Sequence, residues 1–148
     1  SSAYEIYPPK LKEPYRTSRY ELGEQMYELL GIARDDKDAR LVQVMQNFKF
    51  FGAPAAIFCF VDRQMGPPQW SDLGMFLQTF MLLAQEYGID TCAQEAWSMK
   101  NDSVSEFVDA DESDILFCGL ALGYKDEDAV INKLSSERRP LDQWAKFL

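Results

Sequence analysis

The sequence predicts an α+β fold, in which a small central sheet is flanked by helices. Two continuous apolar runs, residues 55–61 and 115–122, have the length and composition of strands that are covered on both faces. A longer segment opens after a Gly-Pro-Pro breaker at 66–68 and stops at Gly88, and its apolar residues recur at helical spacing. With 148 residues, 47% of them hydrophobic, the chain can form one domain with a sizeable core.

The N-terminal third predicts an extended segment followed by two amphipathic helices. Residues 1–14 contain three prolines and are expected to lie extended over a surface. A helix is expected from Thr17 or Ser18 to Gly31, and a second helix is expected after the cap Asp35-Asp36. The side chains expected to face inward are Tyr20, Leu22, Met26, Leu29 and Leu30 in the first helix, and Ala39, Val42, Met45 and Phe48 in the second.

The central helix that ends at Gly88 is apolar nearly all round. Ser71 and Asp72 are expected to cap its start and to favour its dipole. A helix of this kind must be buried all round, and its four interrupting polar residues argue against a membrane span. Protein must therefore cover its second face, either from elsewhere in this chain or from a second copy.

The later elements are shorter. Residues 89–92 predict a short strand that delivers Gln94, Glu95 and Ala96 to a loop. Asn101 or Asp102 is expected to cap a helix that runs to Val108. The acid-rich residues 109–114 lack the glycine and the final acid of a calcium loop, so they predict a solvated turn.

Composition excludes several classes of function. The net charge of -9, without a basic run, argues against a nucleic-acid partner. The absence of histidine removes Ser-His-Asp and Cys-His catalysis and the common zinc sites, and no phosphate-binding glycine loop occurs. No metal site is predicted, and an enzyme built on this chain would take its reactivity from a cofactor.

Three separated cysteines, Cys59, Cys92 and Cys118, form no metal or redox motif. In their apolar surroundings they are expected to be buried reduced thiols, which suits a cytoplasmic protein, and no secretion signal is visible. A cysteine-based redox protein is the alternative, and it would require a reactive exposed thiol.

Three ordered sets of residues resemble the FMN-dependent nitroreductase family. The first set lies in the central helix and the loop that follows it, and it comprises Trp70-x-Asp72-x-Gly74, Gln78, Leu82-Leu83-Ala84, Gly88-Ile89-Asp90-Thr91-Cys92 and Gln94-Glu95-Ala96. The second set is Ala53-Pro54 before the first apolar strand. The third set is Gly123-Tyr124 followed by Arg138-Arg139-Pro140-Leu141.

The resemblance implies a single nitroreductase-like domain over residues 1–148, with a mostly antiparallel sheet, in a homodimer with FMN sites at the subunit interface. It implies ping-pong hydride transfer from NAD(P)H through FMN to a nitroaromatic or quinone-like acceptor. The N-terminal flavin-binding segment of the family has no counterpart in this sequence, so we expect an N-terminally incomplete fragment. The alternative is a catalytically silent dimerisation or ligand-binding module that has lost FMN.

The same resemblance assigns the cofactor contacts. It places Arg138, beside Arg139, on the FMN phosphate, where a guanidinium offers bidentate donors, although a solvated pair is the alternative. It places the Gln94-Glu95-Ala96 loop at the flavin N5 edge, with the Ala96 amide as donor and Glu95 near the ring. Ala96 stands where relatives often have glycine and requires ordinary backbone angles or mild strain. No protein side chain is expected to be catalytic.

Two further segments leave alternatives open. The aromatic residues Tyr27, Phe48, Phe50 and Phe51 can shape a substrate pocket or belong to the core. The tail, residues 141–148, alternates imperfectly like a strand, and it can wrap a neighbouring subunit or pack on its own domain, with Trp144 on the wrong side for a regular strand.

Overall fold

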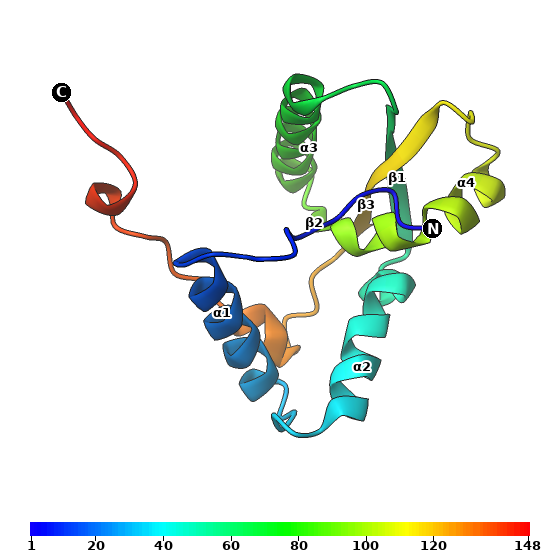
Figure 1. Cartoon of the computed structure of the whole chain (residues 1–148). Helices are drawn as coiled ribbons and strands as arrows, with labels where there is room; N and C mark the ends of the chain where they lie inside the picture. The colour runs from blue at the N-terminus through cyan, green and yellow to red at the C-terminus, as the bar shows by residue number, and fades with distance from the viewer. The chain divides into compact units, whose positions relative to one another are not determined.

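The computed structural model describes all 148 residues of the chain. They divide into two compact units (Figure 1). The first unit comprises Ser1–Leu11 and Asp38–Lys125, and the second unit comprises Lys12–Lys37 and Asp126–Leu148. The single domain expected from the sequence stays a prediction.

The first unit is built on a three-stranded antiparallel sheet. Its strands are β1 (Ala55–Asp62), β2 (Asp90–Gln94) and β3 (Asp114–Gly123), in the order β1-β3-β2. Both neighbours of β3 run antiparallel to it. The predicted α+β class and all three predicted strands are confirmed.

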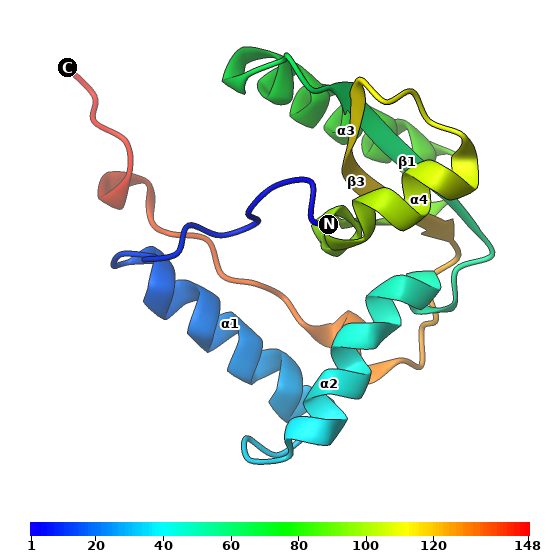
Figure 2. The same cartoon turned by 45° about the vertical axis from the view of Figure 1, so that its right-hand side comes forward.

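Strand β3 is the centre of the core because both of its faces are covered. On one face, Cys118 and Leu120 cluster with Leu77 of the central helix α3 (Pro67–Glu86). On the other face lies Trp97, whose ring would meet any side chain added at Gly119. Figures 1 and 2 show α3 and the short helix α4 (Asn101–Val108) on different sides of β1 and β3.

A β-bulge interrupts the pairing of β1 with β3. Cys59 lies opposite Cys118 and Phe60 lies opposite Leu116, so Phe117 has no partner on β1. Neighbouring residues of β1 point to opposite faces of the sheet, and their partners Cys118 and Leu116 do the same. Cys118 and Leu116 are therefore both buried, but on opposite faces of the sheet. In a strand without a bulge, two residues separated by one would point to the same face.

The central helix ends where predicted, but it begins inside the predicted breaker and has a different cap. It begins at Pro67, because proline suits the first helical position, and the Gln69 side chain accepts a hydrogen bond from the Gly66 amide at 3.2 Å. Ser71 and Asp72 lie beyond the first turn, so their predicted capping role is wrong. The helix is followed by Gly88, whose φ of 71° few other residues adopt readily.

The outer face of α3 is exposed in this chain. Leu77 is its one buried residue. The side chains that remain largely exposed are Met75, Phe76, Leu82 and Leu83. The all-round burial predicted for this helix is therefore not achieved by the chain itself. No helix of the structure has the length and hydrophobicity needed to cross a membrane.

Two helical segments precede β1. They are α2 (Lys37–Met45) and the 3-10 segment η1 (Gln46–Gly52) (Figure 2). Helix α2 follows Asp35-Asp36 as predicted. Its expected inner residues Val42 and Met45 are exposed, because no residue of α2 is buried within this chain.

The N-terminal segment is irregular and is held on the first unit, as predicted. The Ala3 amide donates to the Ser98 carbonyl at 2.8 Å, and the Tyr4 hydroxyl donates to the Phe117 carbonyl at 2.5 Å. The Tyr4 ring packs edge-on against Trp70 at 5.0 Å. Burial, with a smaller contribution from the nearby Glu95 charge, raises the pKa of Tyr4 to about 12.

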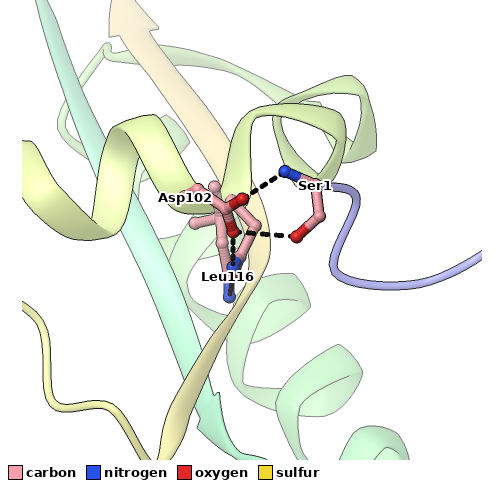
Figure 3. A network of polar contacts seen from close by, with 4 residues as sticks. Ser1, Asp102 and Leu116 are labelled. Atoms are coloured by element: carbon pink, nitrogen blue, oxygen red, sulfur yellow. Dashed lines mark hydrogen bonds and ion pairs between the residues drawn. The ribbon is translucent and has the colours of Figure 1, made fainter.

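A polar network ties this segment to α4 and β3 (Figure 3). Asp102 accepts hydrogen bonds from the Ser1 ammonium and hydroxyl groups. The buried Asn101 side chain donates to Asp102 at 3.1 Å and accepts from the Leu116 amide at 2.9 Å. The hydrogen bond from the ammonium group is the main cause that lowers the pKa of Asp102 to about 2. The predicted helix to Val108 is confirmed, but the predicted capping role of Asn101 or Asp102 is wrong, because the helix begins at Asn101 and its N-cap residue is Lys100.

The acidic residues that follow α4 form a turn, as predicted. Asp111 accepts hydrogen bonds from the amide and hydroxyl of Ser113 at 2.8 and 2.7 Å. These bonds lower the pKa of Asp111. Helix α4 is capped by Asp109, the residue after its end, which adopts a left-handed conformation with φ of 55°.

The cysteines only partly match the prediction. Cys118 is buried and Cys59 is half-buried, but Cys92, on the edge strand β2, is exposed. All three thiols are free. Burial raises the pKa of each of them, that of Cys118 to about 11, so none is an activated thiolate.

The second unit contains the helix α1 (Tyr15–Leu29) and two 3-10 turns, η3 (Val130–Lys133) and η4 (Leu141–Gln143). The first predicted helix is thus confirmed, although it begins two or three residues earlier than expected. The prediction of a strand-like tail is wrong. The Gln143 and Trp144 amides donate to the carbonyls of Pro140 and Leu141, at 3.1 and 3.2 Å, as in a 3-10 turn. No neighbouring strand offers the tail a ladder, so its hydrogen bonds are made locally.

Candidate functional site

The turn from β2 into the 3-10 segment η2 (Glu95–Lys100) is the candidate site of the first unit. Gln94 is the last residue of β2 and pairs with Gly119, and the chain then turns away from the sheet. The first amides of such a helix have no carbonyl acceptor within it, so those of Glu95 and Ala96 are available donors. The non-glycine residues with positive φ are Phe50, Phe51 and Asp109, so Ala96 keeps ordinary backbone angles.

The Gln94 side chain does not face solvent. It is 3% exposed, and its Nε2 atom donates to the backbone oxygen of Asn47 at 2.9 Å and to the Asn47 Oδ1 atom at 3.3 Å. Its Oε1 atom is buried and has no protein partner. The side chain therefore links the end of β2 to η1, and its neighbour Glu95 is the exposed residue of the turn.

Aromatic rings fill the space between η1 and η2. Trp97 stacks on Phe50 with ring centroids 4.6 Å apart, and it meets Phe48 and Phe58 edge-on at 5.3 and 5.1 Å. A Cβ atom at Gly119 would lie 2.4 Å from Trp97 Cδ1, so the close approach of this ring requires glycine. Phe48 and Phe50 thus belong to a packed cluster, which agrees with the core interpretation.

The backbone of η1 is strained beside this cluster. Phe50 and Phe51 adopt φ values of 50° and 51°, in the left-handed region that non-glycine residues rarely occupy. Strain of this kind persists where the surrounding structure enforces it, and it is frequent at functional sites. Phe51 is 47% exposed, so of the two strained residues it is the one available to a ligand. Tyr27, the fourth predicted aromatic, belongs to the second unit.

Arg138 and Arg139 form a separate candidate site, in the second unit. They line a cavity of about 440 Å³ with Ser18, Glu21 and Glu137 among its other walls. Arg139 donates to the Ser18 Oγ atom at 2.6 Å and to the Pro14 carbonyl at 3.2 Å, so it fixes the tail to the first turn of α1.

Arg138 makes only local contacts. Its Nη1 atom donates to the carbonyl and hydroxyl oxygens of Ser136 at 3.0 and 2.5 Å. Neither of the paired arginines forms an ion pair with a carboxylate. The Arg138 guanidinium is therefore exposed and free of acidic partners, which leaves it able to bind an anion.

Sequence reasoning did not identify Asn47, Trp97 or Ser18 as parts of these sites. Asn47 lies between two apolar segments and contributes mainly its backbone carbonyl, which carries no sequence signal. Trp97 follows directly after the recognised Gln94-Glu95-Ala96 motif, and it could have been found as the aromatic partner of Gly119 only with the strand register known.

The nitroreductase family profile matches residues 2–124. The chain is 34% identical to 4-nitrobenzoate reductase of Pseudomonas putida over 95% of its own length and 62% of the relative's. It is 31% identical to nitrobenzene nitroreductase of Ectopseudomonas oleovorans over 98% and 64% of the two lengths.

Solved structures agree with these matches. The FMN and NADPH-dependent nitroreductase NfnB from Sphigopyxis sp. strain HMH superposes with a TM-score of 0.97 and 43% identity, over 100% of this chain and 66% of that one. NfnB of Mycobacterium smegmatis, solved in complex with NADPH, gives 0.94 and 26% over the same shares. The chain thus spans a little under two thirds of these relatives. By profile, identity and fold, it belongs to the nitroreductase family.

Proposed function

We propose that this chain carries out, or contributes to, FMN-dependent reduction of nitroaromatic or quinone-like acceptors at the expense of NAD(P)H. The observation that carries the proposal is the match of the whole chain to an FMN and NADPH-dependent nitroreductase at a TM-score of 0.97. Relatives that reduce 4-nitrobenzoate and nitrobenzene favour a nitroaromatic substrate.

The residues present fit a flavin ring in the first unit. Bound FMN supplies hydride transfer at N5, by accepting hydride from NAD(P)H and delivering it to the acceptor. The Ala96 amide, free of an acceptor within η2, is the proposed hydrogen-bond donor to N5, and the exposed Glu95 side chain lies beside it. We assign Gln94 to this site through its backbone, because its side chain is buried against Asn47.

The residues present also fit the FMN phosphate in the second unit. Arg138, which has no carboxylate partner, is the proposed ligand, with Arg139 in the same cavity. The ring and phosphate contacts are proposed for each unit by itself, and in an oligomer they can come from one subunit or from two.

We propose that the chain works as a homodimer. The exposed apolar residues of α3 form a surface that water disfavours, and a second copy would cover it. The tail, with Trp144 and Phe147 exposed, offers further apolar surface to a neighbour. The three free thiols favour a cytoplasmic location for this enzyme.

No side chain of the chain is proposed as a catalytic acid or base. The protein's part is to orient the flavin and two flat substrates that bind in turn. Phe51, exposed and next to the ordered aromatic cluster, is the residue of η1 best placed to contact such a substrate.

The proposal is tested by FMN titration of the purified chain, followed by NADPH oxidation with 4-nitrobenzoate as acceptor. Saturable FMN binding with the absorbance of protein-bound flavin, and nitroaromatic-dependent NADPH consumption, are the expected results. A colourless protein that takes up no FMN supports the alternative, a silent dimerisation or ligand-binding module. Light scattering of the same sample, and of a Leu82→Glu variant that places a charge on the exposed face of α3, tests the dimer.

A further inference from the structure

Gln94, the last residue of β2, is a buried polar residue of the candidate site, and one of its two polar atoms has no protein partner. A buried amide that satisfies only part of its hydrogen-bonding capacity costs more than an apolar side chain of the same size would. A role in holding two segments together accounts for its presence.

Gln94 makes a direct hydrogen-bonded link between the end of β2 and η1, beside the aromatic packing of η1 on η2. Its Nε2 atom reaches the Asn47 backbone oxygen, 47 residues earlier in the chain, at 2.9 Å. Asn47 is itself fixed, because its Nδ2 atom donates to the Val44 carbonyl at 2.9 Å. The Gln94–Asn47 contact therefore joins the end of β2 to a well-anchored point of η1.

The end of β2 and the segment η1 each carry a backbone conformation that the candidate site depends on. On one side of the contact, Glu95 and Ala96 follow Gln94 directly. On the other side, Phe50 and Phe51 follow Asn47 within four residues, and their left-handed backbone persists only if the surroundings enforce it. The stack of Phe50 on Trp97 closes a second link between η1 and η2.

We propose that Gln94 is a positioning residue that sets the backbone of Glu95 and Ala96 and the strained conformation of η1 together. It touches no reacting atom and acts through Asn47 on one side and through its own peptide bond on the other. Its consequence for the cofactor rests on the proposed function. A shift of a few tenths of an ångström at the Ala96 amide would weaken the hydrogen bond proposed for flavin N5.

The first test needs no substitution. In NMR spectra of the 148-residue chain, the Gln94 side-chain amide is expected to exchange slowly with solvent and to show contacts to the protons of Asn47 and Phe48. Fast exchange and signals like those of an exposed glutamine would overturn the proposal, because the amide would then not be bound to Asn47.

The second test uses a matched pair of variants. Gln94→Met removes the donor while keeping an unbranched side chain of similar length. Gln46→Met makes the same change one residue before Asn47, where the Nε2 atom donates only to the Val42 carbonyl of the preceding helix α2, at 3.4 Å. Amide exchange in Gln94→Met is expected to rise about tenfold in residues 47–51 and 95–96, without a rise in β3. An equal rise in β3 would mean general destabilisation and would overturn the positioning role.

A third test, FMN binding to both variants, separates this inference from the proposed function. FMN is added to each variant, and affinity and the visible spectrum of the bound flavin are measured. Gln94→Met is expected to lose about tenfold in affinity, with an altered spectrum, and Gln46→Met to stay within about twofold. Unchanged binding by Gln94→Met would overturn the role toward the cofactor. If the unmodified chain binds no FMN, the proposed function fails, and amide exchange alone decides whether Gln94 positions the two segments.

Discussion

The two units differ in how they use apolar side chains. Every buried residue of the chain lies in the first unit, where strand β3 is covered on both faces. The second unit has no buried residue, and side chains such as Tyr20, Leu22 and Leu29 of α1 remain exposed.

This difference indicates which part of the chain is stabilised by its own packing. The first unit has a core of the kind that folds cooperatively, whereas the second is ordered by helix formation and by polar contacts such as Arg139 to Ser18. Apolar residues left exposed in a helix are typical of surfaces that other protein covers. Substitutions of equal chemistry should therefore have unequal effects in the two units.

The largest effect is expected from truncation in the core. Leu120 is 1% exposed at the centre of β3, so Leu120→Ala should lower the free energy of unfolding by about 2–5 kcal/mol. Leu22→Ala in α1, where the side chain is 40% exposed, should cost less than about 1 kcal/mol. Urea unfolding of both variants measures the difference, and equal losses would contradict the contrast between the units.

In the second unit, Arg138→Ala is expected to change the affinity for FMN and not the free energy of unfolding. Loss of a charge-assisted hydrogen bond to phosphate should weaken FMN binding by about tenfold or more. Unfolding should be unchanged, because the side chain contacts only its neighbours Ser136 and Glu137. Arg139→Ala is the matched variant and should loosen the tail from α1. Unchanged FMN affinity in Arg138→Ala would show that the phosphate binds elsewhere.

A pair of glycines sharpens the comparison within the first unit. Gly119→Ala forces a methyl group into Trp97 and should destabilise the fold by about 1–3 kcal/mol. Gly74 in α3 has no atom within 4 Å of the added methyl position, so Gly74→Ala should stabilise the helix by about 0.5–1 kcal/mol. Thermal unfolding should therefore shift in opposite directions for the same substitution.

The smallest effect is a pH dependence confined to the first unit. The pKa of Tyr4 is raised from its ordinary 10.0 to about 12, mainly by burial. On alkaline titration the unfolded chain loses this proton first, so the contribution to stability is complete below pH 10.0 and is lost as the pH rises to about 12. Cys118 acts in the same direction, between 9.0 and about 11. Unfolding of Tyr4→Phe, followed across this range, should decline less steeply with pH than that of the unmodified chain.

The elements of the fold could largely be predicted because their signals are local. The apolar runs at 55–61 and 115–122 predicted β1 and β3, and the segment between the Gly-Pro-Pro breaker and Gly88 predicted α3. The tail could not be predicted in the same way. Its alternating pattern requires a neighbouring strand, and without one the chain forms the turn η4.

The candidate site was predictable at its backbone and not at its side chains. The motif Gln94-Glu95-Ala96 marks the turn after β2, and the paired arginines mark the cavity of the second unit. The burial of the Gln94 side chain and its bond to Asn47 depend on a contact across 47 residues, which periodicity does not reveal. The exposure of Cys92 depends on which part of β2 other elements cover, because Gln94 on the same strand is buried.

The bulge at Phe117 has a consequence for anyone who redesigns this protein or aligns relatives to it. The extra residue divides β3 into two half-strands, residues 114–116 and 118–123, whose odd and even positions exchange their inward and outward roles. A substitution table built on one alternation along the whole strand would place polar groups in the core on one side of the bulge. Deleting Phe117 would rotate Leu116 out of its pocket, even though every remaining side chain would still be suited to a strand.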